Sequence, residues 1–204
     1  MKRWFKRMLM IMTVLLVIGV VLVVWLVQKP VPDEITYGMS FNTLYARELG
    51  LDWQVVYDAF LDDLAVRHLR LAAHWPMVEP RDDVYNFAEL DYQLDRAEEV
   101  GAEVIFGVGR RLPRWPECHV PEWAADLSWE EQQAEILEYL TVVVNRYKDS
   151  PAVKIWQVEN EPFLEVFAYE HCGDTDEEFL QQEIELVRSI DDSRPILVTD
   201  SGNL

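Results

Sequence analysis

The chain alternates short apolar runs with segments of helical periodicity, and this alternation constrains its fold more than any other feature. Five runs rich in β-forming residues are expected to be strands, at 35–42, 66–72, 102–108, 153–158 and 195–199. Apolar residues at helical spacing fill the intervals at 52–65, 86–101, 128–147 and 175–190. Regular alternation of this kind predicts repeated βαβ units, a parallel sheet and the α/β class.

Local signals support several of these boundaries. Asp52 is placed to cap the first of these helices, and three further helices open on capping-box patterns, at 86–89, 128–131 and 175–178. Gly38 lies inside the first apolar run, where a strand glycine indicates close approach of another backbone. The sequence therefore predicts where the helices begin as well as their number.

A longer apolar run sets the N-terminus apart. Residues 8–27 contain no charged side chain and, at about 1.5 Å per residue, are long enough to cross a hydrocarbon layer of roughly 30 Å. Basic residues precede the run at Lys2, Arg3, Lys6 and Arg7. Because basic flanks stay on the cytoplasmic side, we expect residues 1–28 to form a cytoplasmic flank and a transmembrane helix. Residues 29–34, with two prolines, are expected to be a linker, and residues 35–204 to face outward.

This apolar run can be either a cleaved signal peptide or an uncleaved membrane anchor. A cleaved signal peptide has a shorter apolar core and a small-residue cleavage site, which the stretch from Trp25 to Pro30 does not offer. An uncleaved anchor in a single-pass membrane protein is therefore favoured, and secretion after signal cleavage is the alternative.

The charge of the chain excludes one class of partner. The formal net charge is −19, although the flank before the apolar run is basic, so the exterior part is more acidic still. Such a surface repels nucleic acid and anionic lipid head groups, and it is indifferent to neutral sugars. The acidity is equally well explained as a means of keeping the domain soluble.

A polar group follows the strand expected at 153–158. Glu159, Asn160 and Glu161 come directly after it, and Pro162 then ends the β pattern. Enzymes built on parallel sheets carry their chemistry in loops at the carboxyl ends of strands. The group is therefore a candidate active site, and the competing interpretation is an ordinary strand-end turn with a capping Asn160 and a solvated Glu161.

The triplet Asn160–Glu161–Pro162 resembles the acid/base motif of clan A, the retaining glycoside hydrolases that share a (β/α)8 TIM barrel. Further segments resemble those enzymes in the same order, at 70–75, 78–80, 85–87 and 112–116. Cellulase-like and β-galactosidase-like families share these features. The resemblance implies that residues 35–204 are the N-terminal portion of such a barrel, with about five βα units.

The resemblance also implies roles for single residues. Glu161 would be the acid/base, and Asn160 would hydrogen-bond the sugar 2-hydroxyl beside the cleaved bond. Arg70 would lie beneath the nucleophile and keep it ionised, and a structural ion pair inside the barrel is the other interpretation.

Aromatic residues are expected to complete the substrate site. His74 and Trp75 follow the second strand and Trp115 follows the third, so the resemblance places them on the active face. Trp rings stack on the C–H faces of sugars. Trp156 lies within a strand and is expected in the core. Neither a cofactor nor a metal ion is implied.

The sequence supplies only part of what the family needs. Retaining hydrolysis requires two carboxyl groups about 5 to 5.5 Å apart, and the family's nucleophile is a second Glu at the end of the seventh strand. A (β/α)8 barrel typically takes about 250 residues, more than follow Gln28. We therefore expect the sequence to be part of a longer reading frame, and an open doubly wound sheet is the alternative.

Two cysteines lie in neighbouring loops of the expected sheet. Cys118 follows the third strand and Cys172 follows the fourth, so a disulfide is expected in an oxidising exterior. Two free thiols, or a zinc site with His119 and His171, are the alternatives.

These observations predict a membrane-anchored glycoside hydrolase that cleaves β-glycosidic bonds of oligo- or polysaccharides with retention. The competing hypothesis is a membrane-anchored carbohydrate-binding or surface interaction module without turnover. A third is an open α/β domain of unrelated function.

Overall fold

The computed structural model describes residues 2–27, 35–164, 172–173 and 175–200, and the chain divides into two units, 1–36 and 37–204. The linker expected at 29–34 and the zinc candidate His171 lie outside the described residues.

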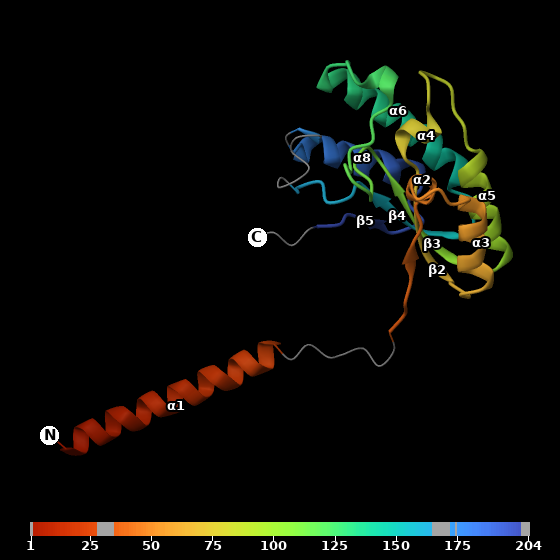
Figure 1. Cartoon of the computed structure of the whole chain (residues 1–204). Helices are drawn as coiled ribbons and strands as arrows, with labels where there is room; N and C mark the ends of the chain where they lie inside the picture. Colours follow the sequence, from red (N-terminus) through yellow and green to blue (C-terminus); the bar gives the residue numbers. More distant parts are fainter. Residues whose placement is uncertain (1, 28–34, 165–171, 174, 201–204) are drawn as a thin grey trace. The chain divides into compact units, whose positions relative to one another are not determined.

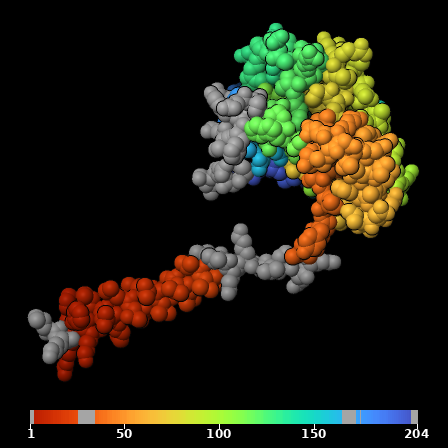
Figure 2. Space-filling model, viewed as in Figure 1, coloured from red at the N-terminus to blue at the C-terminus, as the bar shows by residue number. Residues whose placement is uncertain are grey.

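The described part of the first unit contains one helix, α1 (Lys2–Val27). Its stretch Arg3–Trp25, drawn in red in Figure 2, is long and apolar enough to cross a membrane. A signal sequence meets the same criterion of length and composition, so this helix supports the anchor and the signal peptide alike.

The second unit is built on one parallel sheet (Figure 1). Its strands are β1 (Met39–Ser40), β2 (His68–Ala72), β3 (Glu103–Val108), β4 (Val153–Val158) and β5 (Ile196–Leu197). They lie in the order β1-β2-β3-β4-β5, and every neighbouring pair is parallel. A doubly wound sheet reverses its strand order at a switch point, whereas strands that follow one another in sequence order are the arrangement of a (β/α)8 barrel. The order therefore favours a barrel portion over the doubly wound alternative.

Helices cover one face of this sheet (Figure 1). They are α2 (Thr43–Glu48), α3 (Trp53–Asp62), α4 (Trp75–Val78), α5 (Ala88–Glu99), α6 (Trp129–Tyr147) and α8 (Glu177–Ile190), with a 3-10 turn at Glu122–Ala124. The four predicted helices correspond to α3, α5, α6 and α8. The short helices α2 and α4 were not predicted, because segments of six and four residues are too short to display helical periodicity.

The predicted caps are confirmed at two helices and wrong in detail at two others. Asp52 accepts the backbone N–H groups of the first turn of α3, and Ser128 forms a complete capping box at α6. Helix α5 begins one residue later than a cap at Asn86 requires, and its predicted partner Glu89 binds Arg47 instead. At α8 the cap is Asp176, whose carboxylate accepts the N–H of Phe179 at 2.8 Å.

Alternate strand residues face the helices and form the core. These are Leu69 and Leu71 in β2, Val104, Phe106 and Val108 in β3, and Trp156 and Val158 in β4, all buried. They pack in one cluster with buried residues of α3, α5, α6 and α8. The prediction that Trp156 belongs to the core is confirmed, since its ring is fully buried and its indole N–H donates to Asp191 at 2.8 Å. Because side chains alternate along a strand, Arg70 and Gln157 lie on the opposite, inward face.

The first strand is shorter than predicted. Only Met39–Ser40 pairs with β2, although the apolar run begins at Ile35. A Cβ at Gly38 would meet the carbonyl oxygen of His68 at 2.9 Å, which confirms the close approach predicted there.

Candidate functional site

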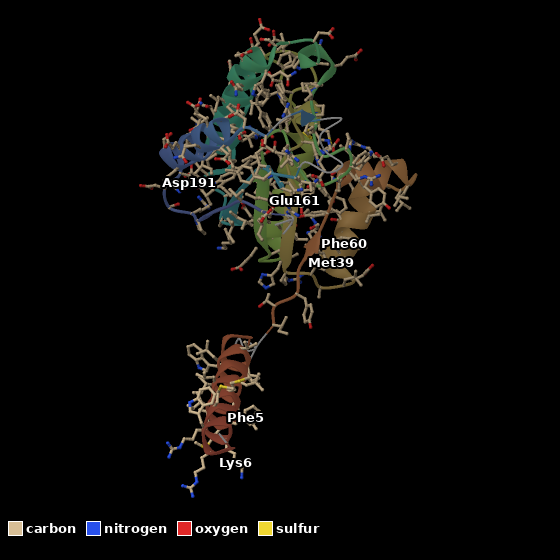
Figure 3. The ribbon with its side chains drawn as sticks, turned by 90° about the vertical axis from the view of Figure 1, so that its left-hand side faces the viewer. Phe5, Lys6, Met39, Phe60, Glu161 and Asp191 are labelled. Carbon is tan, nitrogen blue, oxygen red and sulfur yellow. A yellow bond between two sulfur atoms is a disulfide. The ribbon has the colours of Figure 1, made fainter. Side chains whose placement is uncertain are left out.

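The candidate site begins where β4 ends. The N–H of Glu159 continues the sheet ladder by donating to the carbonyl of Val108 at 3.0 Å, and the chain then turns. Both Glu159 and Glu161 have positive φ, at 59° and 47°. Left-handed backbone is sparsely populated by residues with a Cβ and marks positions held by their surroundings. The turn thus presents Glu161 just beyond the carboxyl end of the sheet; its place is labelled in Figure 3.

Arg70 links the inward face of the sheet to this turn. Its Nε donates to Oε1 of Gln157 at 2.7 Å, and its Nη2 donates to Oδ1 of Asn160 at 2.6 Å. Burial lowers the pKa of Arg70, while the charges of Glu161 and Glu117 act in the opposite direction. The guanidinium therefore orients the Asn160 amide and supplies positive charge to two carboxylates.

Thr199 fixes the turn from the next strand. Its Oγ1 accepts the N–H of Glu161 at 3.1 Å and lies 3.2 Å from Oδ1 of Asn160, to which it donates. Thr199 lies two residues beyond β5, so residues in or after β2, β4 and β5 contribute to the positions of Asn160 and Glu161. Sequence reasoning placed Thr199 at the end of the fifth strand and assigned it no function.

Glu117 is a second carboxyl group at this site, and sequence reasoning missed it. It lies in the loop after β3, which folds back through a bridge between Arg111 and Cys118. Burial raises the pKa of Glu117 and the charge of Glu161 raises it further, while Arg111 and a hydrogen bond from Asn160 act against both. Nothing in the sequence distinguishes this Glu from the other acidic residues, because its place depends on the fold of the loop.

His74 lies beneath the loop after β3. It is only 3% exposed, its Nε2 lies 3.3 Å from the carbonyl of Pro113, and its ring packs edge-on against His119 at 4.3 Å. Burial lowers the pKa of His74 to about 3, with His119 adding to the effect, so the ring is neutral at pH 7. In this arrangement His74 supports the loop and presents almost no surface to a ligand.

The two tryptophans expected to stack on sugar occupy different environments. Trp75 is the first residue of α4, where its ring is fully buried in the core and its indole N–H donates to Glu79 at 2.7 Å. The expectation for Trp75 is therefore corrected, since a fully buried ring offers no face to a sugar. Trp115 is 56% exposed in the loop that also carries Glu117. Of the two, Trp115 has a surface available for stacking.

The sequence and the fold of the chain match those of known proteins. The model of glycosyl hydrolase family 10 matches residues 71–195, well over half of the chain. The chain belongs to glycosyl hydrolase family 10. The predicted resemblance to the clan A (β/α)8 glycoside hydrolases is confirmed, and the family, which the sequence motifs left open, is fixed.

Solved structures share the fold of this family 10 chain. GH5_18 from Streptomyces cattleya in complex with GlcNAc is 16% identical, with a TM-score of 0.60 over 80% of this chain and 43% of its own. Xylanase 10B from Thermotoga petrophila RKU-1 in complex with xylobiose is 20% identical, with a TM-score of 0.57 over 80% and 49%. A β-galactosidase from the Antarctic haloarchaeon Halorubrum lacusprofundi is 15% identical, with a TM-score of 0.58 over 83% and 37%. The chain spans less than half the length of each.

The two cysteines of this family 10 chain are joined. Cys118 and Cys172 form a disulfide with Cα atoms 5.4 Å apart, the first of the three alternatives for these residues. Nη2 of Arg110 donates to the carbonyl of Cys172 at 2.9 Å, so a hydrogen bond accompanies the covalent link. The loops after β3 and β4 are thereby tied together beside the turn that carries Glu161.

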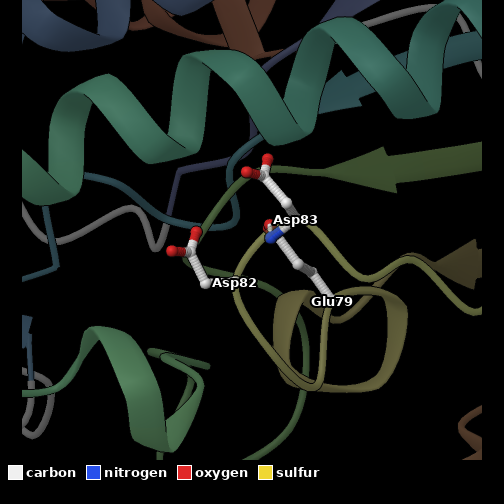
Figure 4. Close-up of side chains that lie close together, drawn as sticks. All are labelled: Glu79, Asp82 and Asp83. Atoms are coloured by element: carbon white, nitrogen blue, oxygen red, sulfur yellow. Dashed lines mark hydrogen bonds between the residues drawn. The ribbon is translucent and has the colours of Figure 1, made fainter.

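An acidic cluster lies outside this site (Figure 4). Carboxylate oxygens of Glu79, Asp82 and Asp83 lie within 4.8 Å of one another. Both oxygens of Glu79 already accept hydrogen bonds, from the Trp75 indole and from the N–H of Asp83, while Asp82 and Asp83 are exposed. Exposed acidic groups at such distances are common without an ion, and we assign no metal to them.

Proposed function

We propose that this protein is a retaining glycoside hydrolase that cleaves β-glycosidic bonds of oligo- or polysaccharides. Glu161 would protonate the leaving oxygen and then activate water, and Asn160 would hydrogen-bond the sugar. The observation that carries the proposal is the position of Glu161, in a strained turn beyond β4, with its neighbour Asn160 oriented by Arg70 and Thr199.

A second carboxyl group accompanies Glu161 at the site. Burial raises the pKa of Glu117, and the charge of Glu161 raises it further, so the shift favours the protonated form of Glu117. The acid/base role proposed for Glu161 therefore rests on its position in the turn and not on these electrostatics.

We propose that the chain consists of a membrane anchor, a linker and an extracytoplasmic domain. Residues 1–28 would be a cytoplasmic flank with a transmembrane anchor, residues 29–34 a linker, and residues 35–204 the N-terminal portion of an extracytoplasmic (β/α)8 barrel. The apolar composition of Arg3–Trp25 supports the anchor. The disulfide between Cys118 and Cys172 supports an oxidising compartment.

The nucleophile would be supplied by chain beyond the five strands. Family 10 membership, and a length under half that of the matched structures, support a reading frame that continues past this sequence. We choose the substrates for the test from the matched structures. They are aryl β-xylobioside, aryl β-galactoside and aryl β-N-acetylglucosaminide.

The test compares hydrolysis by the full reading frame that carries this sequence with hydrolysis by its Glu161→Gln variant. Loss of general acid–base catalysis predicts a fall of about 10²- to 10⁴-fold. Glu130→Gln, the same substitution at an exposed position in the first turn of α6, serves as the matched control and is expected to keep full activity. Undiminished hydrolysis by Glu161→Gln would refute the assigned role. Saturable oligosaccharide binding without turnover would favour the carbohydrate-binding module.

A further inference from the structure

Glu159, which the proposed reaction does not use, accepts two backbone hydrogen bonds close to the site. Its side chain turns toward the loop after β3, where Oε1 accepts the N–H of Arg110 at 2.7 Å and Oε2 accepts the N–H of Arg111 at 2.5 Å. The residue is buried, with 4% of its surface exposed. One carboxylate thus satisfies two successive backbone donors just past the point where the β3–β4 ladder ends.

The backbone of the neighbouring loop leaves room for this carboxylate at one position. Gly109 has φ of 117°, a region that residues with a Cβ rarely adopt. A Cβ built there would lie 2.4 Å from Oε1 of Glu159, well inside van der Waals contact. The contact therefore requires both a glycine at 109 and a carboxylate at 159.

The same loop holds the turn that carries Glu161. The N–H of Asn160 donates to the carbonyl of Arg111 at 2.6 Å. The buried guanidinium of Arg111 then donates to the carbonyls of Pro162 and Leu164, each at 2.8 Å. Residues 159–164 are thus attached to Arg110 and Arg111 before and after Glu161.

A second buried carboxyl group completes the surroundings of Glu159. Glu183 of α8 is 1% exposed and forms a hydrogen bond with Glu159. Burial raises the pKa of Glu183 well above its ordinary value, and the charge of Glu159 adds to this, so Glu183 is the protonated partner and donates the bond. Arg110 faces both carboxyl groups and balances the charge of Glu159.

We propose that Glu159 is a positioning residue, which holds the left-handed turn at 159–161 through the backbone of Arg110 and Arg111 and thereby orients Glu161. This inference rests on the proposed function for its catalytic consequence. Its structural part stands on the contacts alone. Non-glycine residues with positive φ persist where surrounding contacts over-determine them, and these contacts supply that constraint.

The test uses the full reading frame with Glu159→Gln, which preserves size and removes the charge and one acceptor. Hydrogen bonds to a charged group are strong enough that their loss predicts roughly tenfold faster amide exchange at Arg110, Arg111 and Asn160. Gly109→Ala places a Cβ against the same carboxylate and is expected to make exchange at these three amides faster as well. Glu183→Gln is the matched control, because a neutral amide can replace a neutral carboxyl as donor to Glu159, and it is expected to keep exchange within about twofold.

Kinetics separate positioning from a merely structural role. Misorientation of Glu161 predicts that Glu159→Gln lowers kcat roughly tenfold while KM stays within about twofold. A residue needed only for folding would lower the amount of folded enzyme and leave kcat per folded molecule unchanged, which would overturn the inference. Unchanged exchange at all three amides would overturn it as well. Absence of hydrolysis by the unmodified protein would refute the proposed function alone, and the exchange result would then decide whether Glu159 holds the turn.

Discussion

Replacing both cysteines by serine tests how much the disulfide beside the site stabilises the fold. The bond joins positions 54 residues apart, and the chain between them contains α6 and β4. Cross-linking removes conformations from the unfolded chain, and the chain-entropy relation gives an entropy change of about 14 cal/mol/K for a loop of this length. At 25 °C this corresponds to about 4 kcal/mol. We therefore expect Cys118→Ser/Cys172→Ser to lower the free energy of unfolding by about 4 kcal/mol.

The assay is urea unfolding of the protein in detergent micelles, followed by tryptophan fluorescence. Reduction of the unmodified protein with a thiol reagent is expected to reproduce the loss seen in the double serine variant. The variant itself is expected to show no further change on reduction, so comparing the two separates the bond from the effect of the serine side chains.

A loss below about 1 kcal/mol in both experiments would refute the reasoning. The unfolded chain would then retain enough structure to keep Cys118 and Cys172 close without the bond, and the entropy relation would not apply.

Further predictions concern the core and the candidate site. Although burial opposes it, hydrogen bonds from Ser193, Trp156 and Arg194 hold the pKa of Asp191 well below its ordinary value, so we expect Asp191→Asn to destabilise the protein by about 3 kcal/mol in urea unfolding at pH 7. A carboxyl group whose pKa is lower in the folded than in the unfolded protein stabilises the fold at pH values above its unfolded pKa. In the unmodified protein this contribution to the free energy of unfolding should fade below about pH 4, and in the variant it should be absent. Parallel pH profiles of stability for the two proteins would contradict this expectation. Trp75→Ala should cost about 3 to 5 kcal/mol of stability, because its ring fills the core. Trp115→Ala should weaken oligosaccharide binding in titration calorimetry with little change in stability, and unchanged affinity would remove Trp115 from the site.

The sequence predicted the sheet best where local signals and burial agree. Strand β4 has the predicted bounds, because Pro151 and Pro162 bracket an apolar run that pairs on both edges. Strand β1 is shorter than predicted, since it lies at the edge of the sheet and pairs with β2 alone. Apolar composition identifies a segment that suits a strand, whereas its paired length depends on neighbours that the pattern does not specify.

The site was predicted where it follows a strand and missed where it depends on a loop. The places of Glu161 after β4 and of Arg70 in β2 follow from the strand pattern, whereas the roles predicted for them come from the family resemblance. Trp75 was misplaced, because α4 begins directly after the strand end and turns the ring into the core. Glu117 was missed, because a loop that folds back on itself brings it close to Asn160. The spacing of residues in the sequence does not predict the path of such a loop.

Leaving-group dependence tests the proposal that Glu161 donates a proton to the leaving group. Aryl β-glycosides whose phenols differ in pKa would be hydrolysed by the full reading frame and by its Glu161→Gln variant. A phenol of low pKa departs without protonation, so the first step should be nearly spared in the variant, while a phenol of high pKa should show the full loss of about 10²- to 10⁴-fold. A loss of the same size for every phenol would contradict the assignment of Glu161 as the acid.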